Sequence, residues 1–233
     1  MKLTFNVKRR RFAATFAAPA LLVCLWLASS SLPAQSRYLA AGEPDGIALL
    51  PPPPPAGSAE EAADLAAVRS VFNARTPAAE ALARKDEGLA FSLFAPAIGP
   101  VFKLDALPKT AALLKEVKLE IGEIINSPKN HWKRLRPYQL DEHLVLGKPE
   151  DNFSYPSGHS TRGTVYAGVL AELCPEKKEA VLALGRQIGW DRVVLGKHFL
   201  TDIYAGRGIN PQNLPLQRVD FRNAIFVSEG RAR

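Results

Sequence analysis

Most of the chain beyond residue 58 carries its apolar side chains at intervals of three and four residues, which is the spacing of one face of an α-helix. The first such segment is bounded by Pro77, and a longer one reaches Asn126-Ser127-Pro128, where we expect the helix to end. The apolar positions are Ala62, Leu65, Val68 and Phe72 in the first segment, and Leu113, Leu114, Val117, Ile121, Ile124 and Ile125 in the second.

Two further helices are expected at 160–173 and 176–190, with Pro175 between them. Few segments alternate apolar and polar residues with a period of two, and alanine is abundant. We find no internal repeat and no second domain. The pattern therefore predicts an all-α, single-domain helical bundle over residues 59–208.

The first 34 residues have the three parts of a secretory signal: a basic run, an apolar stretch at 12–28 and an end of small residues. The apolar stretch is short for a membrane span and Pro19 interrupts it, so an uncleaved anchor is the weaker alternative. Loose matches to a twin-arginine signal at residues 9–12 and to a lipoprotein site at Cys24 leave the export route open. We expect cleavage near Ala34 and a periplasmic or secreted protein.

Two segments flank the predicted domain. Residues 35–58 include five consecutive prolines and are expected to form an irregular arm along the domain surface, with a recognition ligand as the alternative. Residues 209–233 form an atypical tail, because Asn210-Pro211 and Pro215 do not continue a helix.

Removal of the signal changes the charge argument. The full chain has a formal charge of +7, but five of its 30 Lys and Arg residues lie in residues 1–34, which hold no Asp or Glu. The mature chain keeps 25 basic and 23 acidic residues, a charge of +2, so its composition does not indicate binding to polymeric nucleic acid. Cys174 is then a lone thiol, and no apolar run after the signal is long enough to span a bilayer.

Three short motifs carry the chemistry of the chain. Together they supply three cations, two histidines, a hydroxyl, a glycine amide and a carboxylate, which is a set suited to holding and attacking a tetrahedral oxyanion. One histidine can act as the nucleophile and the other as the proton donor. The motifs are Lys129-x6-Arg136-Pro137, Pro156-Ser157-Gly158-His159 and Arg192-x5-His198-x3-Asp202.

The expected positions of the motifs bring them toward one site. Gly158 and His159 lead into the helix that starts near Ser160, where free amides and the helix dipole favour an anion. His198 and Asp202 are four residues apart and would share a helix face, an arrangement that is also found in surface pairs and metal sites. The basic residues next to the first motif, Lys133 and Arg134, fit either a solvated loop or a substrate-attracting cluster.

The three motifs in this order resemble the signature of the type 2 phosphatidic acid phosphatase superfamily, which includes vanadium haloperoxidases, membrane lipid phosphatases and secreted class A bacterial nonspecific acid phosphatases. The superfamily pattern is Lys-x6-Arg-Pro, Pro-Ser-Gly-His and Ser-Arg-x5-His-x3-Asp, and one position differs: Asp191 stands where the family has Ser. The chain is most similar to the class A enzymes, over most of residues 38–207. The resemblance implies a helical bundle of the phosphatase and haloperoxidase kind.

The resemblance also implies a role for each motif residue. His198 attacks phosphorus and becomes a phosphohistidine, Asp202 hydrogen-bonds the ring of His198, and His159 protonates the leaving alcohol and later activates water. Phosphate is bound by three cations and two further donors: Lys129, Arg136, Arg192, the Ser157 hydroxyl and the Gly158 amide. Neither a metal nor another cofactor is required. Asp191 is expected either to compete with phosphate for Arg192 or to point away and orient a neighbour.

These implications predict a secreted, metal-independent acid phosphatase that hydrolyses small phosphomonoesters and is inhibited by phosphate or vanadate. The alternatives are a lipid or polyprenyl phosphate phosphatase, a vanadate-dependent haloperoxidase and a catalytically impaired phosphate-binding protein. No stable membrane span is expected after signal removal, and homo-oligomerisation is left open.

Overall fold

Two antiparallel helices, α7 (Gly158–Leu173) and α8 (Lys178–Val194), form the centre of the fold. The computed structural model describes residues 44–211, so the predicted signal and nearly all of the predicted tail lie outside the described residues. Every regular element between 44 and 211 is an α-helix or a 3-10 helix, which confirms the all-α prediction.

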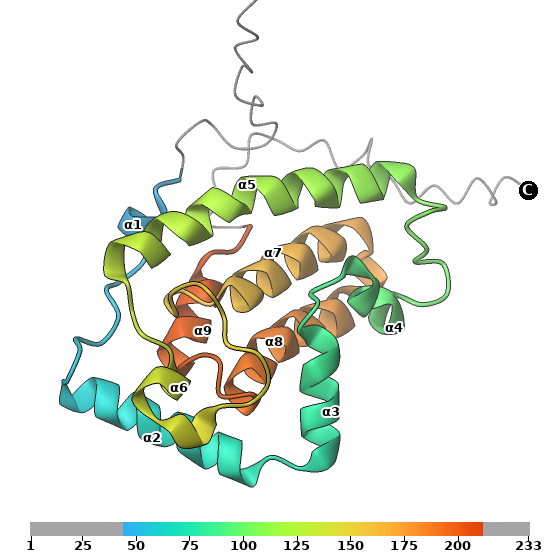
Figure 1. The fold of residues 1–233 in the computed structure, drawn as a ribbon. Helices are drawn as coiled ribbons and strands as arrows, with labels where there is room; N and C mark the ends of the chain where they lie inside the picture. The colour runs from blue at the N-terminus through green and yellow to red at the C-terminus, as the bar shows by residue number, and fades with distance from the viewer. Residues whose placement is uncertain (1–43, 212–233) are drawn as a thin grey trace, which may run out of the picture. The chain divides into compact units, whose positions relative to one another are not determined.

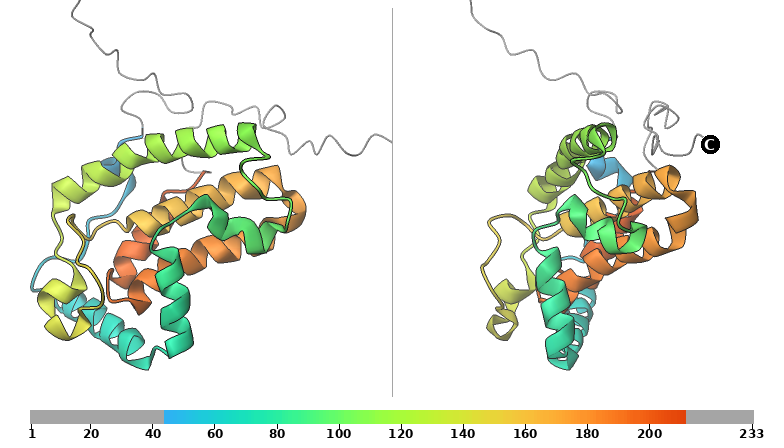
Figure 2. Two further views of the ribbon diagram at one scale, coloured as in Figure 1. Left: turned by 45° about the vertical axis from the view of Figure 1, so that its right-hand side comes forward. Right: turned by 90° about the vertical axis from the view of Figure 1, so that its right-hand side faces the viewer.

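Shorter helices and one long helix surround this pair (Figure 1). The long helix α5 lies along α7, and α3 and α2 pack against α8 (Figures 1 and 2). Helix α9 packs against α7, α8 and α2, which places the end of the third motif beside the start of the second. The remaining α-helices are α1 (Gly46–Leu49), α2 (Ala59–Ala74), α3 (Pro77–Asp86), α4 (Ala95–Ile98), α5 (Pro108–Trp132), α6 (Pro137–Leu140) and α9 (Leu200–Gly208). The 3-10 helices are η1 (Phe91–Phe94), η2 (Glu142–Leu144) and η3 (Pro175–Lys177).

Small polar residues cap the N-termini of α2, α3 and α7. Ser58 caps α2 by accepting a hydrogen bond from the Glu61 amide at 3.1 Å, and Thr76 caps α3 in the same way. Ser157 accepts from the Ser160 amide at 3.3 Å and so caps α7. The second motif therefore ends in a helix N-terminus, as the sequence predicts.

The buried apolar residues of 44–211 include one large cluster, one smaller cluster close to the motifs, and a group of three residues between α3 and the end of α8. The large cluster joins α5 to α7 and α8 and includes Ile121, Ile125, Tyr166, Leu170 and Val181. The smaller one joins α2 to the end of α8 and the start of α9, and includes Val68, Phe72, Val193, Phe199 and Ile203. Because Val193 directly follows Arg192 and Phe199 directly follows His198, this cluster fixes the backbone of the third motif between α8 and α9.

The boundaries of two predicted helices were wrong. Helix α5 does not end at Pro128 but continues to Trp132, so Lys129 lies in its last turn. Proline removes the donor that would pair with the Ile124 carbonyl, and Gly46 packs so closely there that a Cβ would overlap this oxygen. Buried side chains on both sides of Pro128 hold the helix together. Helix α8 likewise continues past Trp190 to Val194 and contains Arg192.

Glycines allow α7 and α8 to approach closely. A Cβ on Gly185 would lie 2.6 Å from both the Ala167 Cβ and the Gly163 carbonyl oxygen. A Cβ on Gly189 would lie 2.8 Å from the Ser160 hydroxyl oxygen. Within residues 44–211, no helix is both long enough and apolar enough to cross a membrane.

Replacing Gly185 by Ala should destabilise the protein, although alanine is the better helix former. The added methyl group has no space between the two helices, and such overpacking costs about 1–3 kcal/mol. Gly122→Ala in α5 is the matched control, because a Cβ there meets nothing within 4 Å. It should stabilise the protein by roughly 0.5–1 kcal/mol. Urea unfolding of the two variants gives the comparison, and equal stabilisation by both would contradict the close contact.

Candidate active site

His198 lies at the centre of the site, in the short connection between α8 and α9 rather than on a helix. The expectation that His198 and Asp202 share a helix face was wrong, because α9 begins only at Leu200. Asp202 is the third residue of α9, and its Oδ2 accepts the Phe199 amide hydrogen at 2.9 Å. The same oxygen lies 3.2 Å from His198 Nδ1. The two side chains therefore meet because Asp202 caps the helix and turns back toward the connection.

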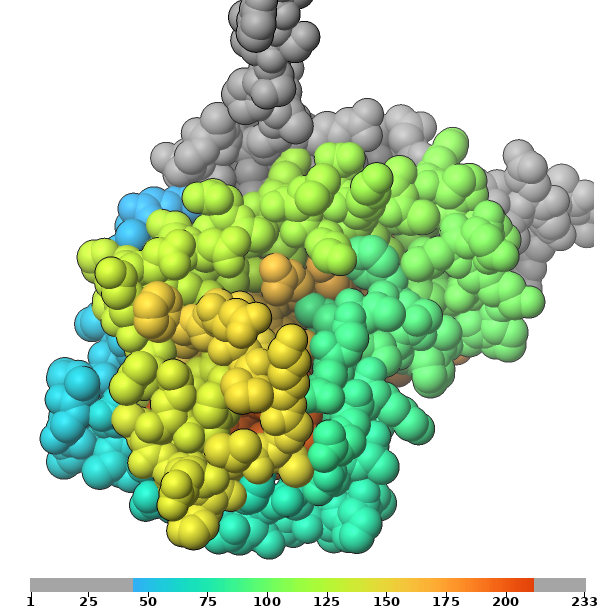
Figure 3. Space-filling view, viewed as in Figure 1, coloured from blue at the N-terminus to red at the C-terminus, as the bar shows by residue number. Residues whose placement is uncertain are grey.

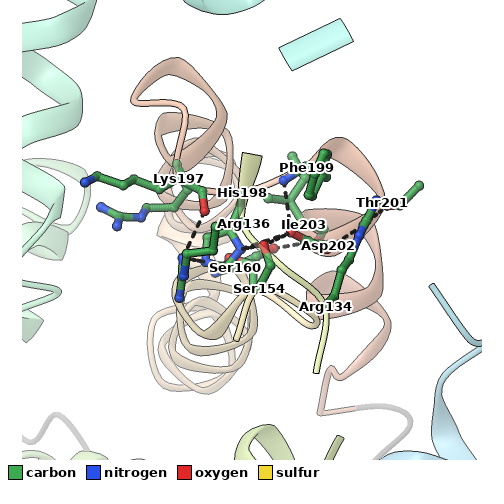
Figure 4. Close-up of polar contacts among 12 residues, drawn as sticks. Arg134, Arg136, Ser154, Ser160, Lys197, His198, Phe199, Thr201, Asp202 and Ile203 are labelled. Carbon is green, nitrogen blue, oxygen red and sulfur yellow. Dashed lines mark hydrogen bonds and ion pairs between the residues drawn. The ribbon is translucent and has the colours of Figure 1, made fainter. Parts of the chain in front are cut away.

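The partners of the His198 ring determine which nitrogen carries the proton (Figure 4). Nε2 lies 3.2 Å from Arg136 Nη1, and a guanidinium can only donate, so Nε2 is the acceptor. Nδ1 then carries the hydrogen and donates it to Asp202. The ring is 1% exposed. Burial, followed by the charges of Arg136 and Lys129, lowers the pKa of His198 well below its usual value. The imidazole is therefore neutral, with its lone pair on Nε2.

Ser154 is a site residue that the sequence analysis missed. Its hydroxyl donates to Asp202 Oδ2 at 2.5 Å and lies 3.3 Å from His198 Nδ1. Only Tyr155 separates Ser154 from the second motif. This closeness to the motif is the feature of the sequence that could have indicated a role for Ser154. Its hydrogen bond to Asp202 Oδ2 helps to hold the carboxylate where it accepts from the histidine.

Arg134 is buried, so neither a solvated loop nor a substrate-attracting cluster describes it. Its Nη1 donates to Asp202 Oδ1 at 2.7 Å, and its Nη2 donates to Asp64 Oδ2 at 2.9 Å. The guanidinium also lies 3.8 Å from the centre of the Phe199 ring. Arg134 thus connects α2 to Asp202 and balances the charge of a carboxylate that is fully buried.

Arg136 is held by backbone carbonyls and by His198. Its Nε donates to the Asn152 carbonyl and its Nη1 to the Lys197 carbonyl, both at 2.9 Å. Its Nη2 donates to Asn152 Oδ1 at 2.5 Å. These contacts fix the guanidinium against the Nε2 side of the imidazole (Figure 4).

Lys129 reaches the same region from the last turn of α5. Its ammonium donates to the Phe153 carbonyl and, at 3.2 Å, to the Ser154 carbonyl. Burial, followed by the charge of Arg136, lowers its pKa to about 7. In this structure Lys129 therefore supports the backbone before the second motif and adds positive charge behind it.

Arg192, in the last turn of α8, has unused hydrogen-bonding capacity. Its side chain is 1% exposed, and both Nε and Nη1 lack a hydrogen-bond partner within the described residues. Nη2 donates to Glu150 Oε1, and Nη1 lies 3.8 Å from Glu87 Oε1. Buried donors without partners are rare in proteins, so this guanidinium is arranged to receive an anion.

The second motif lines the same region through α7. The Ser157 amide donates to the Asp202 carbonyl at 3.0 Å, and Gly158 is the first residue of the helix. His159 Nε2 donates to the Glu87 carbonyl at 3.1 Å. Burial and then the charge of Arg192 lower the pKa of His159 to about 4. The Ser157 hydroxyl is used as the cap of α7.

Asp191, the departure from the family pattern, does not compete for Arg192. Its Oδ1 accepts from Gln187 at 2.7 Å, one turn earlier in α8. Burial, together with the neighbouring Asp86 carboxyl, raises the pKa of Asp191 to about 7. Asp191 therefore points away from Arg192 and contacts a neighbour, which is the second of the two arrangements expected from the sequence.

The structure thus brings together seven of the eight predicted site residues around one buried centre: Lys129, Arg136, Ser157, His159, Arg192, His198 and Asp202. The eighth, Gly158, follows Ser157 directly, and a Cβ there would lie 3.0 Å from Arg162 Nη1. Among the side chains of residues 44–211, no three His, Cys, Asp or Glu are grouped to hold a metal ion. The arrangement offers a neutral nucleophilic nitrogen beside three cations, which suits a small, doubly charged oxyanion.

Comparison with known proteins identifies the class that this fold and site define. The profile of the PAP2 superfamily matches residues 117–209, a range that contains all three motifs. A non-specific acid phosphatase of Providencia stuartii is 34% identical over 174 residues, which is 70% of this chain and 70% of that protein. The chain therefore belongs to the PAP2 superfamily and, within it, to the bacterial non-specific acid phosphatases, which confirms the resemblance inferred from the motifs.

Other relatives match a shorter segment. A non-specific acid phosphatase of Salmonella typhimurium is 35% identical over 122 residues, and an acid phosphatase of Zymomonas mobilis is 35% identical over 118 residues. These alignments cover 49% and 48% of this chain, and the chain spans about half the length of either relative, 48% and 45%. The crystal structure of a transmembrane PAP2 type phosphatidylglycerolphosphate phosphatase from Bacillus subtilis gives a TM-score of 0.47 at 24% identity, covering 66% of this chain and 82% of that one.

Asp191 should make stability depend on pH. Its pKa is 3.8 as a free side chain and about 7 in the folded protein, so the folded state holds more protons between these values. Stability therefore falls as the pH rises from about 4 to 7. Asp191→Asn removes this titration. Its Tm should exceed that of the wild type at pH 8, by about 2–4 °C for each kcal/mol gained, and the difference should shrink toward pH 4.

Scanning calorimetry from pH 4 to pH 8 measures this effect. Asp105→Asn, at an exposed aspartate, is the control for the loss of one negative charge. An Asp191→Asn variant that is less stable than the wild type at pH 8 would show that the ionised carboxylate stabilises the fold.

Proposed function

We propose that this chain is an exported acid phosphatase that hydrolyses small phosphomonoesters through a phosphohistidine, without a metal ion. The names of its relatives support the activity. The observation that carries the proposal is the neutral His198 ring, whose acceptor nitrogen faces Arg136, near a buried Arg192 with two donors that find no acceptor among residues 44–211. Export rests on the signal-like segment at 1–34.

In the first step His198 Nε2 attacks the phosphorus atom of the bound ester. A nitrogen–phosphorus bond forms as the bond from phosphorus to the alcohol oxygen breaks. The proton on Nδ1 stays hydrogen-bonded to Asp202, which stabilises the positive charge that develops on the ring. Arg134 and Ser154 keep this carboxylate in position, so both are positioning residues. Arg136 and Arg192 stabilise the negative charge on the phosphoryl oxygens.

His159 handles the proton of the alcohol. In the neutral ring Nε2–H is donated to the Glu87 carbonyl, which leaves Nδ1 as the nitrogen that takes up and releases a proton. The protonated ring gives this proton to the leaving oxygen. In the second step it takes a proton from the attacking water, the nitrogen–phosphorus bond breaks, and inorganic phosphate is released.

The position of Asp191 supports catalysis over a purely binding role. A catalytically impaired protein was an alternative because Asp191 could have occupied Arg192. The Asp191 carboxyl instead contacts Gln187 and is neighboured by Asp86. The guanidinium of Arg192 therefore keeps its free donors for the substrate.

Hydrolysis of p-nitrophenyl phosphate at pH 5–6 in the presence of EDTA tests the proposal. The wild type should turn over the ester, and His198→Ala should lose activity by at least about 10³-fold because the nucleophile is absent. His143→Ala removes an exposed histidine of η2 and should keep wild-type activity. Loss of the wild-type activity in EDTA would contradict the metal-independent mechanism, and full activity of His198→Ala would contradict the phosphohistidine.

The protonation of His159 should respond to an anion in the site. Its pKa of about 4 in the empty site is caused by burial and by Arg192. A bound oxyanion offsets the charge of Arg192, so the pKa should rise by about one unit or more. NMR titration of ¹³C-labelled histidines with and without vanadate measures this, and the resonance of the exposed His143 serves as the control. An unchanged His159 pKa in the vanadate complex would place the anion elsewhere.

A further inference from the structure

Glu150 bridges the two arginines of the proposed phosphate site. Its Oε1 accepts from Arg192 Nη2, and its Oε2 lies 3.7 Å from Arg136 Nη2. Each carboxylate oxygen thus faces a different guanidinium, and both guanidiniums are 1% exposed. No motif includes Glu150, and the sequence analysis assigned it no role.

The backbone on both sides of Glu150 is anchored, so the carboxylate is presented at a fixed place. The Glu150 amide donates to the Tyr138 hydroxyl oxygen at 2.9 Å. Two residues earlier, the Lys148 carbonyl accepts from Lys197 Nζ at 2.7 Å. Two residues later, Asn152 accepts from Arg136 through both its carbonyl and its side chain.

The segment that carries Glu150 also lies over the centre of the site. In Figure 3 the yellow segment before α7 covers this face, and the red C-terminal part of the chain is seen only through a small opening between it and teal α3. The Glu150 side chain is 26% exposed, whereas that of His198 is 2% exposed. Solvent therefore reaches the Glu150 side chain but hardly reaches that of His198.

The carboxylate of Glu150 is charged at pH 6, the pH of the titration described below. Burial raises its pKa, but the neighbouring positive charges, those of Arg136 and Arg192 first, together leave the pKa below its usual value. A phosphoryl group needs the same two arginines. It must either displace this carboxylate or bind beside a like charge, and both alternatives weaken its binding.

A supporting role for Glu150 explains these contacts less well. Arg136 is already held by three backbone carbonyls, those of Asn152, Phe153 and Lys197. Arg192 offers Nε, Nη1 and Nη2, yet Glu150 hydrogen-bonds only Nη2, and within the described part of the chain the other two have no hydrogen-bond partner. A residue that merely held Arg192 in place would use more of this fork.

We propose that Glu150 is a built-in competitor for the phosphate site: its carboxylate occupies the two arginines when the site is empty and lowers the affinity for phosphate. The inference rests on the proposed function, because it takes the same arginines as the phosphate ligands. In a phosphatase such a competitor limits the retention of inorganic phosphate, the last product to leave, and so shortens the occupancy of the site after each turnover.

Calorimetric titration with inorganic phosphate at pH 6 and fixed ionic strength tests the inference. Glu150→Gln keeps the shape of the side chain without its charge, and Glu150→Ala removes the arm. Both should bind phosphate about tenfold more tightly than the wild type, and phosphate should inhibit them more strongly as a product. Asp151→Asn, at the exposed neighbouring acid, changes net charge equally and should bind phosphate within about twofold of the wild type.

The outcomes separate this inference from the proposed function. If both folded Glu150 variants bind phosphate no more tightly than an active wild type, the competitor role of Glu150 is wrong. The proposed phosphatase function is then unaffected. An equal gain in Asp151→Asn also overturns it, because the effect would then come from net charge. If neither the wild type nor the Glu150 variants bind phosphate or hydrolyse the ester, the phosphate site itself is wrong. Tighter binding by the Glu150 variants alone supports the competitor.

Discussion

The buried carboxylate of Asp202 is the group on which the rest of the site depends. It is 0% exposed and accepts hydrogen bonds from a backbone amide, a hydroxyl, an imidazole and a guanidinium. These donors come from the start of α9, the segment before α7, the connection after α8 and the segment after α5. An unpaired carboxylate at this depth would be costly, so each donor has to be in place for the fold to be stable. The same requirement fixes the direction of the His198 ring.

A consequence of this arrangement is that the groups used for stability and for chemistry overlap. Arg134 balances the charge of Asp202 and never needs to meet the substrate. Arg136 fixes the backbone of the segment before α7 and also faces His198. Among residues 44–211, Arg192 keeps two buried donors without a hydrogen-bond partner, Nε and Nη1, whereas Arg134 keeps only its Nε. The hydrogen-bond partners of each arginine therefore show whether it mainly stabilises the fold or keeps donors available for an anion.

The sequence was sufficient to predict the helical fold and the residues of the three motifs, because both depend on the spacing of residues that are close together in the chain. Its errors arose where tertiary contacts override local rules. Pro128 was taken as a helix end, but Gly46 packs against its turn and the helix continues. His198 was placed on a helix, but the cap made by Asp202 starts α9 after it. The partners that the sequence could not supply are distant in the chain: Arg134 and Asp64 are 70 residues apart, and Ser154 and Asp202 are 48 apart.

The ion pair between Arg134 and Asp64 joins the site to a helix that lies outside the superfamily profile. The superfamily profile spans residues 117–209, whereas Asp64 lies in α2, well before that range. A fragment confined to the profile would carry every motif residue but would leave Arg134 with only one of its two carboxylate partners. Removing one partner of a buried ion pair typically costs about 3–5 kcal/mol. The residues that the site needs therefore extend beyond the superfamily profile and include Asp64 of α2.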